Sequence, residues 1–194
     1  MNKSEVGLFF DILEDKMGEL NMTNKADRIF NIDESGFQLK TSPSTVVAPK
    51  VVGLKEKLPD DSDVFLNEQS AYINAQLFFV VIKKFVDYFH ISKESPAILI
   101  LDGHDSHCSN PDILGFAVEN GLCLLCLPPH NTNWLQPADK VLFAPLKRAY
   151  YDACSHFVRN HSRAFTKVEF GHLIKEASER VATVGLASNS FRAT

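Results

Sequence analysis

Three aspartates stand at positions where a folded chain could use them to bind a divalent metal ion. Asp33 follows the mostly apolar run 28–32, Asp102 follows a second apolar run at 97–101, and Asp139 opens a long helical pattern. A carboxylate at the end of a buried strand is unfavourable unless an opposite charge compensates it, and a divalent cation commonly does so. Singly, each aspartate is better explained as a turn former, a cap or a first-turn helix residue. Together they indicate metal-assisted phosphoryl chemistry on nucleic acid.

The positions of these aspartates also suggest how a metal site would form. In open α/β sheets, sites are built at the carboxyl ends of the strands. If the strands before Asp33 and Asp102 are neighbours, the two carboxylates would raise each other's pKa unless a cation sits between them. Asp139, near a helix N-terminus, is favoured by the helix dipole and could complete the ligand set. Two Mg²⁺ ions about 4 Å apart would then activate a water or a 3′-hydroxyl.

The hydrophobic pattern around the aspartates predicts alternating strands and helices. We expect helices at residues 4–20, 74–89, 111–120, 137–160 and 168–184, and strands at 28–32, 97–101 and 122–127. The pattern of residues 35–50 predicts a short strand or a loop, and that of residues 51–70 predicts an irregular connection. The strand–helix–strand–helix–strand order implies parallel strands with helices on the faces of the sheet, which is the α/β class.

Composition indicates one soluble globular domain. The 194 residues are 45% hydrophobic, which is enough for one core. We predict a single domain over 1–194, with an N-terminal helix at 4–20, a core at about 27–160 and a C-terminal helical segment at about 165–185. The most apolar stretch, 77–82, is too short to cross a bilayer, and no secretory signal is visible.

Charge is distributed unevenly along the chain. The formal net charge of −4 argues against an autonomous nucleic-acid-binding domain. Residues 1–139 carry 11 Lys and Arg against 20 Asp and Glu, whereas residues 140–194 carry 9 against 4. A phosphate-facing surface is therefore expected at the C-terminal end. Its basic residues include Lys140, Lys147, Arg148, Arg159, Arg163 and Lys167. For most of them, a solvated helix face is the simpler explanation.

Other reactive side chains lie close to the aspartates in sequence. His104 and His107 could orient a scissile phosphate or hold Asp102, but with Cys108 they match no standard zinc finger. Trp134 could stack on a base, although packing is the simpler role.

Cys123 and Cys126 form a CxxC inside an apolar run. Three positions apart on a strand, their side chains point to opposite faces. We expect two small buried hydrophobic residues rather than a zinc or redox site. Four cysteines in a chain of this length do not make a disulfide framework, and the thiols fit a reducing compartment, the cytosol or the nucleus.

Three sequence segments around the aspartates form a specific set when taken together. They are RIFNIDESGF at 28–37, LDGHDSH at 101–107, and LPPHNTNWLQPAD at 127–139, which continues to FAPLK at 143–147. In this order they resemble the three motifs of the pogo-type DDE transposases, which include Tigger, Jerky and centromere-protein-B relatives within the wider mariner-like superfamily. The 37 positions between Asp102 and Asp139 also suit that family.

The resemblance implies a ribonuclease-H-like catalytic domain, with a mixed sheet and flanking helices, that cuts and joins DNA. It implies that Asp33, Asp102 and Asp139 bind two Mg²⁺ or Mn²⁺ ions. The implied partner is DNA, either transposon ends or derived sites, the implied location is the nucleus, and a homodimer would fit. The expected DNA contacts are His104, His107, Lys140, Lys147 and Arg148.

The chain departs from the family pattern in three ways. No helix-turn-helix DNA-binding module precedes the catalytic region, the segment 50–66 is short, and the chain ends at Thr194 where relatives continue. Relatives carry two further antiparallel strands between the first two aspartates. We therefore expect a truncated or internally deleted copy whose sheet lacks one or two edge strands. The alternatives to an active nuclease are a catalytically inactive, transposase-derived protein that binds nucleic acid or another partner, and a decayed element without function.

Overall fold

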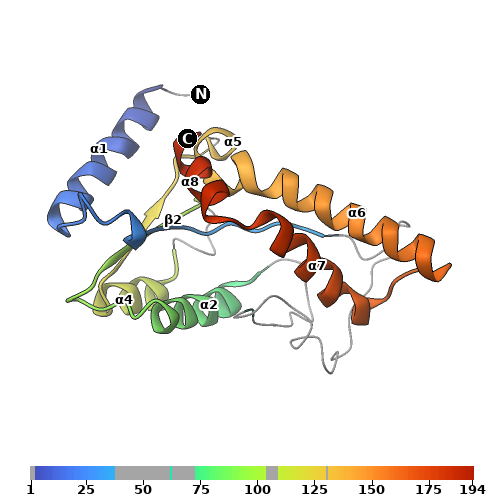
Figure 1. Ribbon diagram of the computed structural model, residues 1–194. Helices are drawn as coiled ribbons and strands as arrows, with labels where there is room; N and C mark the ends of the chain where they lie inside the picture. The colour runs from blue at the N-terminus through green and yellow to red at the C-terminus, as the bar shows by residue number, and fades with distance from the viewer. Residues whose placement is uncertain (1–2, 38–61, 63–72, 104–108, 130) are drawn as a thin grey trace. The chain divides into compact units, whose positions relative to one another are not determined.

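The computed structural model describes residues 3–37, 62, 73–103, 109–129 and 131–194, which are drawn in colour in Figure 1. The chain divides into two compact units. Unit 1 comprises Met1–Asp33 and Ala71–Gln136, and unit 2 comprises Glu34–Ser70 and Pro137–Thr194. The assignment of the whole chain to a single domain stays a prediction.

Unit 1 is built on a three-stranded parallel sheet. Its strands are β1 (Ile29–Asn31), β2 (Ala97–Leu101) and β3 (Leu122–Cys126), in the order β1-β2-β3. Helix α2 (Ala75–Tyr88) precedes β2, and helix α4 (Pro111–Glu119) connects β2 to β3. The three predicted strands and their parallel arrangement are confirmed, as is the α/β class.

Alternate residues of β2 pack into two cores, one on each face of the sheet. The first, third and fifth residues of β2 face α2 and α4, whereas the second and fourth face helix α1 (Lys3–Glu19). All five are buried, which is the pattern of a central parallel strand covered on both sides. Figure 1 shows the resulting layers, with α1 on one side of the sheet and α2 and α4 on the other.

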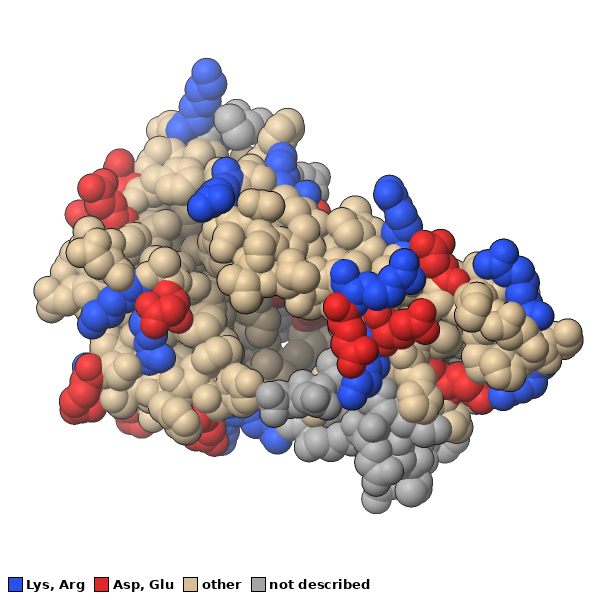
Figure 2. Space-filling model, viewed as in Figure 1, with Lys and Arg blue, Asp and Glu red and all other residues tan. Residues whose placement is uncertain are grey.

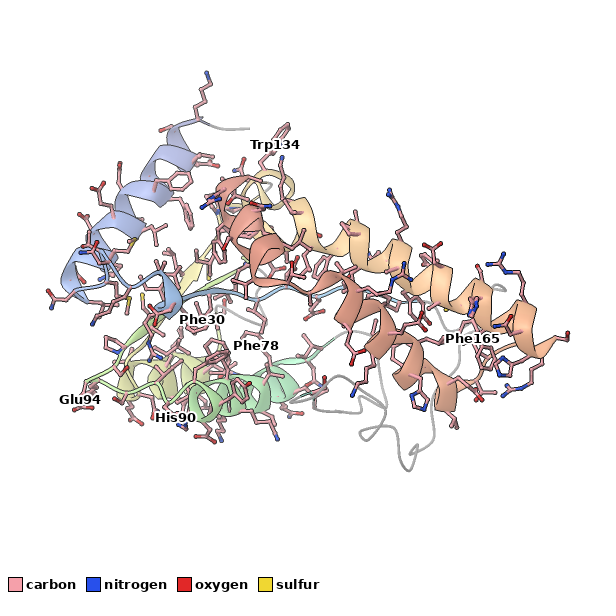
Figure 3. All side chains as sticks on the ribbon, in the orientation of Figure 1. Phe30, Phe78, His90, Glu94, Trp134 and Phe165 are labelled. Atoms are coloured by element: carbon pink, nitrogen blue, oxygen red, sulfur yellow. The ribbon has the colours of Figure 1, made fainter. Side chains whose placement is uncertain are left out.

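An aromatic cluster holds β1 against α2. The ring centroid of Phe30 lies 5.0 Å from that of Phe85, edge to face, and 4.4 Å from that of Phe89. Phe78, also in this core, is labelled with Phe30 in Figure 3. Each such aromatic pair contributes about 0.5–1.5 kcal/mol beyond its buried area. The cluster therefore fixes the first strand beside the helix that leads to the second.

Asparagine side chains cap the N-termini of the two helices on this face, α2 and α4. The side chain of Asn74 accepts a hydrogen bond from the Leu77 amide at 2.9 Å, and that of Asn110 accepts one from the Asp112 amide at 2.9 Å. Each bond satisfies an amide that has no partner inside the helix. Pro111 occupies the first turn of α4, as predicted, because its missing N–H is not needed there.

The turn from α4 into β3 depends on Gly121. Its φ of +75° lies in the left-handed region that favours glycine. A Cβ at this position would lie 2.4 Å from the carbonyl oxygen of Ser92. The Gly121 carbonyl also accepts the Ala97 amide at 3.1 Å, so this glycine joins the starts of β2 and β3.

Cys123 and Cys126 point to opposite faces of the sheet, as predicted. Cys123 packs in the α1 core and Cys126 in the core formed with α2 and α4. Cys123 is a free thiol, and burial raises its pKa. Cys126 is disulfide-bonded. The expectation that both residues act only as small hydrophobic side chains is therefore wrong for Cys126.

Unit 2 is helical in the part that the structure describes. It contains the π-turn η3 (Ala138–Leu142) and the helices α6 (Phe143–His161), α7 (Lys167–Val181) and α8 (Val184–Arg192). The predicted helix over 168–184 is confirmed as α7, but it ends three residues early. The prediction missed α8, which begins where the Thr183 side chain accepts the Leu186 amide at 3.1 Å.

The start of the long helix differs from the prediction. The sequence predicts one α-helix from Pro137, whereas the first turn is widened and the Phe143 amide donates to the Ala138 carbonyl, five residues earlier. Pro145 has no N–H and cannot form the α-helical bond to Val141, so an irregular turn precedes it.

The core of unit 2 is centred on Tyr150 of α6. This side chain is fully buried, and its ring makes edge-to-face contacts with Phe37 at 5.1 Å and Phe170 at 5.8 Å between centroids. Burial and a hydrogen bond with Cys154 raise the pKa of the Tyr150 hydroxyl well above its ordinary value. The hydroxyl therefore stays protonated and serves packing.

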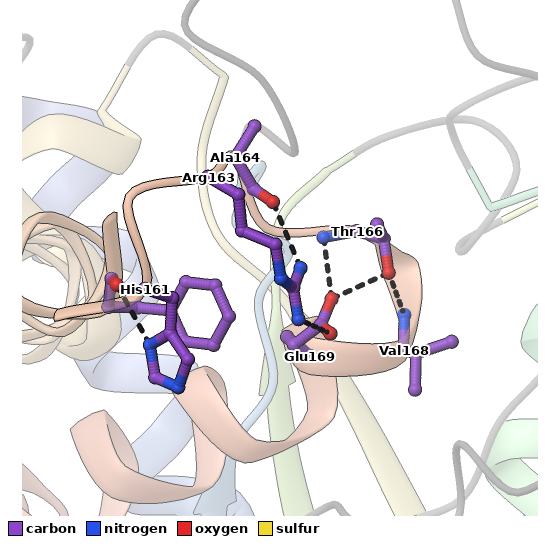
Figure 4. A network of polar contacts seen from close by, with 7 residues as sticks. His161, Arg163, Ala164, Thr166, Val168 and Glu169 are labelled. Carbon is purple, nitrogen blue, oxygen red and sulfur yellow. Dashed lines mark hydrogen bonds and ion pairs between the residues drawn. The ribbon is translucent and has the colours of Figure 1, made fainter. Parts of the chain in front are cut away.

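A capping box begins α7 (Figure 4). The Glu169 carboxylate accepts hydrogen bonds from the Thr166 amide at 2.7 Å and from the Arg163 guanidinium at 2.8 Å. The Thr166 hydroxyl in turn accepts the Val168 amide at 3.2 Å. Hydrogen bonds from Arg163 and then Thr166 lower the pKa of Glu169 to about 2. Two helix-end donors are thus satisfied within one turn.

The expected antiparallel edge strands are not among the described residues, in which the sheet is wholly parallel. They would fall between Asp33 and Asp102, and most of 35–70 lies outside the described residues. The mixed sheet with missing edge strands, and the short strand or loop at 35–50, therefore stay predictions.

We expect Gly121→Ala to destabilise the protein by about 2 kcal/mol or more, because alanine is strained at positive φ and its methyl group meets the Ser92 backbone. Gly115→Ala is the matched control. Gly115 lies inside α4 with open space at its Cβ position, so alanine should stabilise by about 0.5–1 kcal/mol. Urea denaturation of both variants measures the difference in the free energy of unfolding. Equal effects of the two substitutions would contradict the role of positive φ and the Ser92 contact at Gly121.

The Glu169 carboxylate should stabilise the fold at neutral pH and lose this effect in acid. Its pKa is about 2 in the fold against an ordinary 4.5. The contribution is therefore complete above about pH 4.5 and disappears as the pH falls toward 2. We expect Glu169→Gln to lower the free energy of unfolding by about 1 kcal/mol at neutral pH. Denaturation curves from about pH 7 to about pH 3 should show this deficit narrowing. A stability deficit that does not change with pH would refute the role of the Glu169 charge. The control is Glu179→Gln, which removes the carboxylate of the surface ion pair with Lys175.

Candidate active site at the strand ends

The parallel pairing of β1 with β2 sets Asp33 level with Asp102. Asn31 is the register partner of Ile100. The Ile32 amide continues the ladder by donating to the Ile100 carbonyl oxygen at 3.0 Å. Because parallel strands advance together, two further residues on each strand bring Asp33 opposite Asp102. The two strands are neighbours, which is the condition that the predicted metal site required.

Strand alternation directs both aspartates to the same face of the sheet. Ile29 of β1 and Ile100 of β2 pack in the core with α1. Every second residue along a strand shares a face. Continued past the last paired residues, this alternation places Asp33 on the face of Ile29, and Asp102 on the face of Ile100. The two carboxylates therefore share one end and one face of the sheet.

The chemistry of this pair fits a divalent ion. Oδ2 of Asp33 is buried, and the Asp102 side chain is half-buried. Two like charges on adjacent strand ends repel each other unless a cation lies between them. Carboxylate oxygens are the hard ligands that Mg²⁺ and Mn²⁺ prefer.

A hydrogen-bonded pair of amides, the half-buried Asn31 and the buried Gln136, joins β1 to the segment that leads to Asp139. The side chain of Gln136 is 1% exposed. Its Oε1 accepts a hydrogen bond from Nδ2 of Asn31 at 2.9 Å, and its Nε2 donates to the Ile32 carbonyl oxygen at 3.1 Å. Sequence reasoning did not single out either amide. The one available signal is that a polar residue, Gln136, stands in an otherwise apolar stretch between Leu135 and Pro137.

The short helix α5 (Thr132–Leu135) leads into Gln136 and carries the single tryptophan. The backbone carbonyl of Asn131 starts the turn by accepting the amides of Trp134 and Leu135, each at 3.0 Å. Leu135 packs in the α1 core, whereas Trp134 is 54% exposed and its ring points outward in Figure 3. The expected packing role of Trp134 can therefore involve less than half of its surface, and the rest meets solvent.

Arg28 fixes the other end of β1. Its guanidinium donates to three backbone carbonyl oxygens before β2, those of Pro96 at 3.2 Å, Phe89 at 3.0 Å and Ser95 at 2.5 Å. Arginine can meet several acceptors at once because its five N–H groups form a rigid fork. The start of β1 is thereby tied to the turn that leads into its neighbouring strand.

The third aspartate and the expected DNA contacts of the long helix lie in unit 2. Asp139 is exposed and lies in the first turn of η3, where the helix dipole favours a negative charge. Lys140 follows it and is also exposed. On α6, Arg148 is exposed, and the Lys147 ammonium lies 6.0 Å from the centre of the Phe143 ring.

His104 and His107 lie outside the described residues. Within the described part of the chain, no group of three or more His, Cys, Asp and Glu side chains could hold a metal ion. Asp33 and Asp102 belong to unit 1 and Asp139 to unit 2. A three-aspartate ligand set therefore stays a prediction.

Acidic and basic side chains are interspersed on the face drawn in Figure 2. In the C-terminal segment, Arg163 pairs with Glu169 at 2.8 Å, and Lys175 pairs with Glu179 at 3.9 Å. Arg163 also lies over the ring of Phe157, 4.9 Å from its centre. For Arg163 the structural role is thus the better explanation.

The fold and the strand-end carboxylates define an α/β protein with a candidate divalent-metal site. A sequence-family comparison matches residues 57–186, more than half of the chain, to the DDE superfamily endonuclease family. The chain therefore belongs to the DDE superfamily of endonucleases. The matched residues include Asp102 and Asp139 and leave out Asp33.

One curated relative is similar over part of the chain. It is the MFS-type transporter clz9 of Cochliobolus lunatus, which is 39% identical over 95 residues, 49% of this chain and 10% of that protein. The chain thus spans about a tenth of the relative's length. Among the described residues, no helix is both long and apolar enough to cross a membrane. No solved structure matches the chain.

Replacing Arg28 by methionine should destabilise unit 1 by about 2 kcal/mol or more, because three carbonyl oxygens lose a charged donor. Lys25→Met removes the same charge from an exposed side chain nearby and should change stability by less than about 0.5 kcal/mol. Thermal unfolding of the two variants measures this difference. Equal melting temperatures would show that the Arg28 hydrogen bonds are not important.

Proposed function

We propose that this chain is a DDE-type endonuclease domain, derived from a pogo-type transposase, that cleaves DNA with the help of divalent metal ions. The observation that carries the proposal is the β1–β2 register, which sets two aspartates level at one end of the sheet. Membership of the endonuclease family supports phosphodiester chemistry, with DNA as the substrate.

Asp33 and Asp102 would hold the ions, and Asp139 is the proposed third ligand. Two Mg²⁺ or Mn²⁺ ions, when bound, would lower the pKa of the attacking water or 3′-hydroxyl and stabilise the charge on the leaving oxygen. Oδ2 of Asp33 is buried, so this oxygen lies away from bulk water.

The proposed cleavage step is an in-line displacement at phosphorus. The water oxygen forms a bond to phosphorus while the bond from phosphorus to the 3′-oxygen breaks. The water proton passes to solvent, and the leaving oxygen takes up a proton to become a 3′-hydroxyl. In strand transfer, a 3′-hydroxyl replaces water as the nucleophile, and no oxidant or other co-reactant is needed.

The DNA would be contacted mainly by basic side chains. Lys140, Lys147 and Arg148 are the proposed phosphate contacts of the long helix, and His104 and His107 those near Asp102. Phosphate contacts make binding steeply dependent on salt. The DNA would be a transposon end or a derived site in the nucleus, and a homodimer would present two such sites.

A nicking assay on supercoiled plasmid tests the proposal. Wild-type protein should nick the plasmid with Mg²⁺ or Mn²⁺ and not with a chelator present. Asp33→Asn and Asp102→Asn should each lower the rate by at least about 100-fold, more than the loss of an outer-shell partner causes. Asp87→Asn, which changes an exposed carboxylate of α2, should nick like the wild type. Cleavage that continues in both active-site variants would refute the proposal.

A catalytically inactive protein that binds DNA is the second candidate. It is favoured by the basic excess of residues 140–194. In that case neither wild type nor Asp102→Asn would nick DNA, yet both would shift a DNA probe at low salt and release it as salt rises.

A further inference from the structure

We infer that Gln136 is a positioning residue, which holds the metal-binding end of β1 in place through an amide clamp with Asn31. The inference rests on the proposed function, because it concerns how Asp33 and Asp102 are held for a metal ion. The clamp is defined as the carboxamides of Gln136 and Asn31 together with the backbone carbonyls that they bind.

Gln136 uses both ends of its carboxamide on β1. Its oxygen accepts from Asn31 at 2.9 Å, and its nitrogen donates to the Ile32 carbonyl at 3.1 Å. Ile32 directly precedes Asp33, and Asn31 lies two residues before it. Both hydrogen bonds therefore fix the backbone next to the candidate ligand.

The clamp also reaches the second strand. Nδ2 of Asn31 donates to the Ile100 carbonyl oxygen at 3.1 Å, two residues before Asp102. The same carbonyl accepts the Ile32 amide at 3.0 Å. One amide pair thus holds the ends of β1 and β2 together, which sets the spacing of their aspartates.

Packing alone would not require a carboxamide at position 136. Gln136 is 1% exposed and follows Leu135, which lies in the α1 core. An apolar side chain of the same length would bury as much surface without needing partners. A hydrogen-bonded pair of carboxamides instead favours one geometry. Partners that orient metal ligands typically contribute 10- to 100-fold to metal affinity.

Gln136 is also the last residue of unit 1, three positions before Asp139. The clamp therefore anchors the point at which the chain leaves unit 1 for the segment that carries the proposed third ligand.

The test compares Gln136→Met, Asn31→Leu and the double variant with the wild type. For each, the Mn²⁺ concentration that gives half-maximal plasmid nicking is measured, together with the Mn²⁺-induced rise in melting temperature. Each single variant should raise the half-saturating Mn²⁺ concentration by about 10- to 100-fold. The double variant should be no worse than the singles, because both residues act through one clamp.

Ile113→Val is the control for a general loss of stability. Ile113 is fully buried in the core on the opposite face of the sheet. The substitution should lower stability by about 0.5–1.5 kcal/mol and leave the half-saturating Mn²⁺ concentration unchanged. If Gln136→Met also leaves that concentration unchanged while the wild type responds to Mn²⁺, the inference is overturned and the proposed function stands.

Hydrogen exchange separates failure of the inference from failure of the proposed function. The Ile32 amide should exchange at least about tenfold faster in Gln136→Met than in Ile113→Val, because the end of β1 opens more often. If the wild type neither nicks DNA nor responds to Mn²⁺, the proposed function fails. In that case, an unchanged exchange rate of the Ile32 amide in Gln136→Met would also overturn the inferred clamp, independently of any metal binding.

Discussion

The candidate site depends on the parallel hydrogen bonding of β1 to β2. The strand β1 has only three residues, so its own ladder is short, and contacts at both ends must hold its register. Arg28 ties its start to the turn before β2, and Gln136 ties its end. A slip by one residue would turn Asp33 to the opposite face and away from Asp102. Every chemical role that we propose for unit 1 follows from this register.

The same strand pairing explains why polar side chains of the site lie next to hydrophobic cores. The sheet is covered by α1 on one face and by α2 and α4 on the other, so its strands end at the edge of two hydrophobic cores. Carboxylates in such a place are unfavourable without a cation, and amides are unfavourable without partners. The structure satisfies the amides of Asn31 and Gln136 with each other and with backbone carbonyls. Asp33 and Asp102 carry like charges on adjacent strand ends, and this is the reason for testing whether the site binds a metal ion.

Local features were predictable because they depend on neighbours in sequence. Strand runs, helix periodicity, Pro111 in a first turn and Gly121 after a helix all act within a few residues. The widened turn η3, the helix α8 and the exposure of Trp134 were missed. These features depend on how a turn packs against the helix or strand that follows it. The periodicity of hydrophobic residues in the sequence does not reveal this. The disulfide of Cys126 was missed because a CxxC pattern does not show which sulfur atoms meet.

The sequence by itself determined the α/β class, the strand ends that carry Asp33 and Asp102, and the family resemblance that the comparison supports at the level of the DDE superfamily. These properties follow from residue type and order. Only the tertiary structure decided that the two strands are neighbours with their aspartates level, and that Gln136 bonds to Asn31 across 105 positions. A hydrogen bond between residues so far apart leaves no periodic trace in the sequence, because it exists only after helices and strands have packed.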